Sequence, residues 1–175
     1  MRRGRFVRIP FFLYSESCLP AEALAEEGVL TYMKKKPPIT FSIISIFPES
    51  FSSYLETSIL GKARKKKLVN IKTVAPRTFS KDKHKTVDHS PYGGGPGMVM
   101  KVEPIYKAVK LIKTKDKGQR IKARTILFST RGKLFTQTDA RRLTAYDHLI
   151  LICGRYEGVD ERVAKYIADE EISIG

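Results

Sequence analysis

The sequence predicts an α/β protein with a mainly parallel sheet flanked by helices. Short apolar, β-branched runs alternate along the chain with segments of helical periodicity, which is typical of this class. The run at 148–153 is apolar at every position after its histidine, as in parallel strands covered on both faces. With 175 residues and 42% hydrophobic content, the chain is large enough for one domain with a core.

In the first half of this domain we expect two strands around one helix. Residues 41–47 predict a buried strand that ends at Pro48, because proline cannot continue a ladder. A helix is then expected from Pro48 to about Lys66, followed by an alternating strand at 69–74 and a polar loop at 76–89. The buried stripe of this helix is predicted to contain Phe51, Leu55, Ile59 and Leu60.

The second half predicts three helices and three strands. Val102-Glu103-Pro104 begins a helix that ends near Gly118, and a strand follows at 124–129. Next come a short helix capped at Thr138-Asp139, the strand at 148–153, a helix capped by Asp160 and a last strand that begins at Ile172. Within the Asp160 helix we expect an i,i+4 ion pair between Glu161 and Lys165.

Residues 1–38 are predicted to be a poorly ordered or non-native extension of a domain that spans 39–175. Their arginines and the short apolar patch at 9–14 imitate a signal peptide only weakly, because Arg8 and Pro10 interrupt the patch. Two cysteines and three scattered histidines form no disulfide framework or zinc motif. No run approaches the ~20 apolar residues that span a bilayer. We therefore expect a cytoplasmic protein.

The charge of the chain indicates a polyanionic partner. It has 33 Lys+Arg against 18 Asp+Glu, a formal net charge of +15. The basic residues gather at 62–67, 77–85 and 107–124. Such runs are also found on faces that merely contact solvent, but here they recur beside a glycine-rich segment, which favours contacts with nucleic-acid phosphates.

Three loops are candidate binding elements. The segment 90–98 holds four glycines and two prolines; it is read either as a mobile lid or as a surface turn. Loops 129–132 and 154–161 each follow a predicted strand, where ligands of parallel sheets bind. The first is also compatible with an ordinary turn, and the second with a helix-start loop in which Asp160 is only a cap.

Taken together, these residues resemble the bacterial tRNA (guanine-N1)-methyltransferase family. The match runs from about Ile39 to Gly175 and includes the strings Pro-Tyr-Gly-Gly-Gly-Pro-Gly-Met at 91–98 and Gly-Arg-Tyr-Glu-Gly at 154–158. The resemblance implies a SPOUT-type fold with a trefoil knot, a homodimer, S-adenosylmethionine as cofactor and tRNA as partner. It also implies a Mg²⁺ ion.

By position, the resemblance assigns three sets of residues. The implied cofactor-binding residues are Leu127, Phe128, Ser129, Thr130, Gly132, Gly154, Arg155, Tyr156, Glu157, Gly158, Val159, Asp160, Ser173, Ile174 and Gly175. The implied substrate or lid residues are Asp88, Tyr92, Gly93, Gly94, Gly95, Pro96, Gly97 and Met98. Glu157 is the implied metal ligand.

The chain departs from the family pattern in three places. Thr130 stands where proline is common, and His89 stands where a second aspartate is usual beside Asp88. The resemblance further implies a carboxyl-terminal tRNA-binding domain and a general-base aspartate, which are absent from these 175 residues. We therefore expect this chain alone to be weakly active or inactive.

The implied reaction transfers a methyl group from S-adenosylmethionine to N1 of the guanosine 3′ of the anticodon. That nitrogen carries a proton at neutral pH, so a general base is required. Two alternatives remain at this point. A non-catalytic basic RNA-binding module explains the charge but leaves the paired glycine-rich loops without a role. A nucleotide-phosphate binder would use the segment 90–98.

Overall fold

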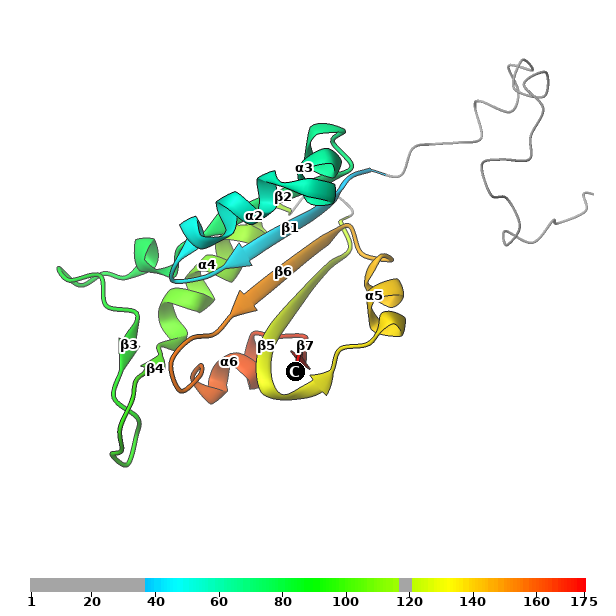
Figure 1. The fold of residues 1–175 in the computed structure, drawn as a ribbon. Coiled ribbons are helices and arrows are strands. Elements are labelled where there is room, and N and C mark those ends of the chain that lie inside the picture. Colours follow the sequence, from blue (N-terminus) through cyan, green and yellow to red (C-terminus); the bar gives the residue numbers. More distant parts are fainter. Residues whose placement is uncertain (1–36, 117–120) are drawn as a thin grey trace, which may run out of the picture. The chain divides into compact units, whose positions relative to one another are not determined.

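Five parallel strands form the central sheet (Figure 1). The computed structural model describes residues 37–116 and 121–175, so all but the last two residues of the extension predicted at 1–38 lie outside the described residues. All four pairings in the sheet are parallel, which confirms the predicted class. The spatial order is β2 (Val69–Val74), β1 (Ile39–Ile44), β6 (His148–Cys153), β5 (Ala123–Leu134) and β7 (Glu170–Ser173).

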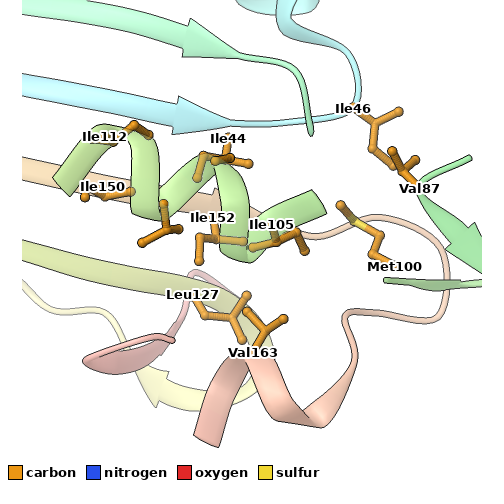
Figure 2. Packing of buried hydrophobic residues seen from close by; sticks show 12 residues of the cluster. Ile44, Ile46, Val87, Met100, Ile105, Ile112, Leu127, Ile150, Ile152 and Val163 are labelled. Carbon is orange, nitrogen blue, oxygen red and sulfur yellow. The ribbon is translucent and has the colours of Figure 1, made fainter. Parts of the chain in front are cut away.

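The helices cover both faces of the sheet, which explains why β6 is apolar on both sides. On one face, α4 (Val102–Lys115) and α6 (Glu161–Tyr166) contribute side chains to the core cluster that contains Ile150 and Ile152 of β6 (Figure 2). On the other face, α5 (Gln137–Leu143) packs on Leu149. Each fully buried isoleucine contributes about 1.5–3 kcal/mol to folding. Within the described ranges, no helix is long and apolar enough to cross a bilayer.

The helix expected from Pro48 to Lys66 is instead three short pieces. A 3-10 turn η2 (Pro48–Phe51) leads into α2 (Ser52–Glu56), and α3 (Ser58–Lys65) follows after a break. Thr57 is extended at the break (φ −100°, ψ 160°), and its hydroxyl donates to the Tyr54 carbonyl. Because α3 starts in a new direction, the stripe from Leu55 does not continue, and Ile59 is 79% exposed. The prediction of a buried Ile59 was wrong.

The polar segment at 76–89 is also more ordered than predicted. It contains a 3-10 turn η3 (Pro76–Phe79) and a short strand β3 (Asp88–His89). This strand pairs antiparallel with β4 (Val99–Met100), so the glycine-rich segment is the tip of a two-stranded hairpin. The sequence contains no alternating run here, because each strand is only two residues long.

The cap of α5 lies two residues before the predicted one. The Thr136 hydroxyl accepts from the Asp139 amide, and the Asp139 carboxylate accepts from the Thr136 amide, which together form a capping box. These contacts hold the pKa of Asp139 down at about 2, with the Thr136 hydrogen bond as the main cause.

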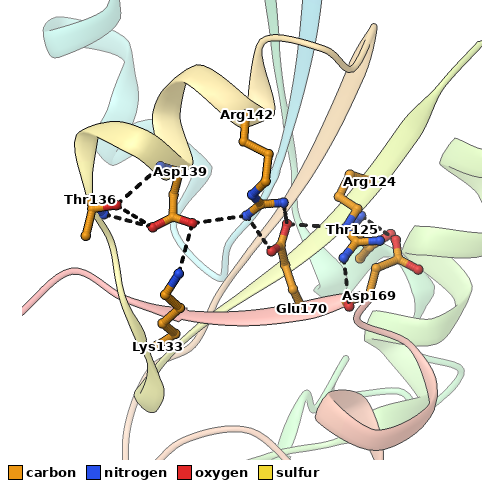
Figure 3. A network of polar contacts seen from close by, with 8 residues as sticks. All are labelled: Arg124, Thr125, Lys133, Thr136, Asp139, Arg142, Asp169 and Glu170. Carbon is orange, nitrogen blue, oxygen red and sulfur yellow. Dashed lines mark hydrogen bonds and ion pairs between the residues drawn. The ribbon is translucent and has the colours of Figure 1, made fainter.

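A network of polar contacts fixes the edge strand β7 to its neighbours (Figure 3). Glu170 of β7 pairs with Arg142 of α5 (2.7 Å) and with Arg124 of β5 (3.2 Å). Just before β7, the Asp169 carboxylate accepts from the Thr125 amide at 2.7 Å. The strand that completes the sheet is therefore held by side chains as well as by its ladder.

A second polar connection joins α4 to the amino-terminal half of the sheet. His148 Nδ1 lies 2.7 Å from a carboxylate oxygen of Asp116, and its Nε2 lies 2.9 Å from the Ser42 hydroxyl. The connectivity is that of a Ser-His-Asp triad, but Ser42 is only 3% exposed and lies in register between two strands. These contacts satisfy buried polar groups and hold the end of α4 to the sheet.

Candidate functional site

The glycine-rich hairpin and the loop at 154–160 are joined backbone to backbone. The Glu157 amide donates to the Met98 carbonyl at 3.1 Å, and the Met100 amide donates to the Gly158 carbonyl at 3.1 Å. Gly97 allows this approach: its φ is +96°, and a Cβ there would lie 2.4 Å from Glu157 Cγ. The two loops that stand out in the sequence thus form one structural unit.

A cavity of about 510 Å³ opens at the carboxyl ends of β5 and β6. This is the position at which open α/β sheets bind ligands, and the volume is in the usual range of small-molecule sites. Ten of the fifteen predicted cofactor residues line it: Leu127, Phe128, Ser129, Thr130, Gly154, Arg155, Tyr156, Glu157, Gly158 and Val159.

One wall of the cavity is a bulge in β5 rather than the turn that the sequence predicted. Phe128 and Lys133 both pair with Ile172 of β7, and the pairing of β5 with β6 ends at Phe128. Residues 129–132 therefore have no paired residue in β6 or β7, both of which are fully described. Gly132 closes this bulge against β7, where a Cβ would lie 2.5 Å from the Ile172 carbonyl carbon. The strand continues to Leu134, beyond its predicted end at Ser129.

The cavity is rich in carboxylates. Glu157, Glu161 and Glu171 line it together with Arg131 and Arg155. Arg131 lies 2.5 Å from Glu161 and 3.9 Å from Glu171, and the Glu161 contact raises the pKa of the guanidinium. The predicted Glu161–Lys165 pair was wrong, because Arg131 takes Glu161 as its partner. An excess of one negative charge favours a cationic ligand.

Three lining residues are not among the fifteen predicted cofactor residues: Arg131, Glu161 and Glu171. Glu171 lies on β7 in register with Leu127, so pairing of the last strand with β5 brings it to the cavity. The Glu171 Oε1 atom is buried and has no hydrogen-bond partner. Knowledge of the strand order would have identified it, but the order does not follow from local patterns.

The five other predicted cofactor residues do not line this cavity. Gly132 supports it from behind, as described above. Asp160 caps α6 and accepts two hydrogen bonds from the Arg162 guanidinium, at 2.9 and 2.7 Å, which lower the pKa of Asp160. Ser173 pairs with Leu134 in the sheet, and Ile174 borders a separate apolar hollow near α5. Gly175 follows as the final residue.

The predicted lid residues also lie outside the cavity. Asp88 is in β3, opposite Met100, and Tyr92 is 82% exposed beside the His89 ring, with centroids 4.9 Å apart. A separate open hollow of about 570 Å³ contains His89, Tyr92 and Arg162. A lid role for the hairpin therefore stays a prediction. Its predicted lid residues are Tyr92, Gly93, Gly94, Gly95, Pro96, Gly97 and Met98.

Aromatic stacking fixes one further side chain at the cavity. The Arg155 guanidinium lies over the Phe47 ring, 4.6 Å from its centroid, and 5.9 Å from that of Tyr156. Phe47 follows β1, so the loop after β6 is held by the end of its neighbouring strand. As for metals, residues 37–116 and 121–175 bring together no group of three His, Cys, Asp or Glu able to hold an ion.

Comparison with known proteins gives a consistent result. The sequence model of the family described as tRNA (Guanine-1)-methyltransferase TrmD matches residues 39–175. A tRNA (guanine-N(1)-)-methyltransferase of Dictyoglomus turgidum is 54% identical over 137 residues, 78% of this chain and 53% of that protein. One from Ruminiclostridium cellulolyticum is 47% identical over 135 residues, 77% of this chain and 57% of that protein.

A solved structure agrees with these sequence matches. The crystal structure of tRNA (m1G37) methyltransferase from Aquifex aeolicus has a TM-score of 0.68 and 39% identity, covering 79% of this chain and 60% of that one. The chain spans a little over half the length of the curated relatives described above. By its sequence from residue 39 to residue 175 and by its fold, the chain belongs to the tRNA (guanine-1)-methyltransferase family.

Proposed function

We propose that the protein transfers a methyl group from S-adenosylmethionine to N1 of the guanosine 3′ of the anticodon in tRNA. The observation that carries the proposal is the cavity at the carboxyl ends of β5 and β6, which ten of the residues implied for the cofactor line together. Relatives about half identical to this chain carry the name of that activity.

The chemistry of the cavity fits the cofactor. The bulge at 129–132 has no ladder partner in β6 or β7. The Arg131 amide donates to the Ser129 hydroxyl at 3.0 Å, and the other backbone groups of the bulge are offered to an adenine ring. Glu157, Glu161 and Glu171 place carboxylates near a ligand that carries a sulfonium and an ammonium group. When bound, S-adenosylmethionine supplies an activated methyl group.

The residues of this chain would contribute mainly by positioning. The loop at 154–158 is held by the hairpin on one side and by Phe47 on the other, so its backbone is fixed before the ligand binds. A fixed pocket lowers the barrier by holding the two reactants in line. The N1 proton of guanine must also be removed by a base.

The proposal extends to Mg²⁺, for which Glu157 offers one carboxylate, and to a homodimer. An apolar hollow of about 280 Å³ near α5, bordered by Phe135 and Ile174, supports an interface, since Ile174 is 75% exposed. The proposal also includes a trefoil knot in the fold and a cytoplasmic location.

Calorimetric titration with S-adenosylmethionine tests the site. Thr130→Trp introduces a large ring at an exposed position of the cavity wall, and we expect it to weaken binding by about tenfold or more. Thr73→Trp is the matched control, because Thr73 is an exposed strand threonine at the other edge of the sheet. Equal loss in both variants, or no binding to the unaltered protein, would contradict the proposed site.

Two further measurements separate the alternatives. Competition by ATP but not by S-adenosylhomocysteine would support a nucleotide-phosphate binder instead. Transfer of a labelled methyl group to a tRNA transcript, lost when the guanosine 3′ of the anticodon is replaced by adenosine, tests the reaction itself.

A further inference from the structure

A run of cations covers the end of α3 and the turn after it. We name Lys62, Arg64, Lys65, Lys66 and Lys67 the α3 basic surface. The four lysines are exposed, and Arg64 is half-buried, with its guanidinium donating to the Leu55 carbonyl at 3.3 Å. The surface borders an open groove of about 720 Å³ next to the start of β2, in which Glu56 is the one acidic residue among the described lining.

The charges of this surface are not neutralised within the described part of the chain. Several cations elsewhere have carboxylate partners, as in Lys107 with Glu103 and Arg142 with Glu170. None of the ion pairs formed by residues 37–116 and 121–175 includes a member of the α3 basic surface. Five like charges within six residues therefore present an open positive field.

The backbone provides a second, independent observation. Lys67 has a φ of +55°, a left-handed conformation that non-glycine residues rarely adopt. It closes α3 in a Schellman motif, in which the Lys67 amide donates to the Arg64 carbonyl and the Leu68 amide to the Ala63 carbonyl. Glycine is the favoured residue at this position, so the backbone of Lys67 is strained. The same lysine adds its charge to the α3 basic surface.

The position of the surface limits what could bind both it and the cofactor cavity. α3 ends where β2 begins, whereas the cavity is at the carboxyl ends of β5 and β6 (Figure 1). Three strand spacings separate β2 from β5, about 14 Å, and a six-residue strand adds about 20 Å along its length. A ligand that reaches both sites must extend over about 25 Å, which is far longer than the cofactor.

We propose that the α3 basic surface binds RNA phosphates remote from the methylated base. The inference rests on the proposed function, because it treats the tRNA as the ligand that spans both sites. Phosphate contacts of this kind position an RNA without reading its sequence. Lys62, Lys65 and Lys66 provide compact charges on one helix end, and the groove beside them has room for a backbone segment.

The salt dependence of tRNA binding tests the surface. We expect the triple variant Lys62→Gln, Lys65→Gln, Lys66→Gln to reduce the slope of log K against log salt by about 2 to 3, with a Kd raised by about tenfold. The control is Lys72→Gln, Lys133→Gln, Lys165→Gln, which removes the same charge at three exposed lysines outside the basic runs at 62–67, 77–85 and 107–124. An unchanged slope, or an equal drop in the control, would overturn the inference.

Lys67→Gly separates a role in RNA binding from a structural one. Glycine relieves the left-handed strain, so we expect the midpoint of thermal unfolding to rise by about 2 to 4 °C while tRNA binding weakens. A variant that is more stable and binds tRNA as before would count against the surface.

Titration with S-adenosylmethionine keeps the two proposals distinguishable. If the α3 variants bind the cofactor normally but lose tRNA, the surface is supported. If the cofactor does not bind the unaltered protein and the triple variant still loses tRNA, only the proposed function fails.

Discussion

Replacing Gly132 with alanine tests whether close backbone contact with β7 holds the wall of the cavity. A Cβ at this position would lie 2.5 Å from the Ile172 carbonyl carbon, 2.6 Å from the Ile172 nitrogen and 2.7 Å from the Glu171 carbonyl carbon. Ordinary contacts of a Cβ begin near 3.4 Å, so β7 would have to move by roughly 1 Å.

The loss of stability in Gly132→Ala depends on which atoms the added Cβ would contact. The obstructing atoms belong to the backbone of a paired strand, and no side-chain rotation relieves the overlap. Overpacking an interior costs about 1–3 kcal/mol, and we expect Gly132→Ala to be at the upper end, about 3 kcal/mol. For a domain of this size, that loss lowers the midpoint of thermal unfolding by about 10 °C.

Urea unfolding followed by circular dichroism measures the loss directly, with Gly154→Ala as its control. A Cβ at Gly154 would lie 3.0 Å from Val159 Cγ2, a side-chain methyl that can move, so we expect a cost of less than about 1 kcal/mol. If both variants lose the same stability, contact with β7 is not what requires glycine at position 132. Gly132→Ala should also weaken cofactor binding, since the bulge is one wall of the cavity.

Two further substitutions test the polar contacts that hold the helices. The pKa of Asp139, lowered from 3.8 to about 2 mainly by Thr136, means that its contribution to stability is complete above pH ~4 and is lost as the pH falls toward 2. Asp139→Asn should therefore flatten the fall in the urea midpoint between pH 4 and pH 2; an unchanged fall would contradict this. Ser42→Ala leaves the Nε2 of buried His148 without its partner and should cost about 1–3 kcal/mol in urea unfolding. A loss below about 0.5 kcal/mol would show that the connection to Asp116 suffices.

Strands β2 and β6 and the loop at 154–158 could be predicted because local sequence patterns identify them. β2 and β6 have the predicted bounds, since alternation and an unbroken apolar run identify them without knowledge of their neighbours. The loop at 154–158 reaches the cavity because parallel strands bring their carboxyl ends to one edge.

The features that the sequence could not reveal depend on contacts between distant residues. Gly132 has an ordinary backbone conformation and is required by the approach of Ile172, forty residues away. Glu171 reaches the cavity through strand order, and Ile59 is exposed because the chain turns at Thr57. Local periodicity contains no information on any of these.

The position of β1 between β2 and β6 has a consequence for synthesis on the ribosome. Its partner β6 follows more than a hundred residues later, with Thr40 beside His148. Until that segment emerges, β1 can pair only with β2. Formation of the sheet therefore depends on a contact between residues far apart in the sequence, and such contacts slow folding. During this interval the nascent chain exposes an unpaired strand edge that can aggregate. We therefore expect the yield of folded protein in cells to depend on chaperones.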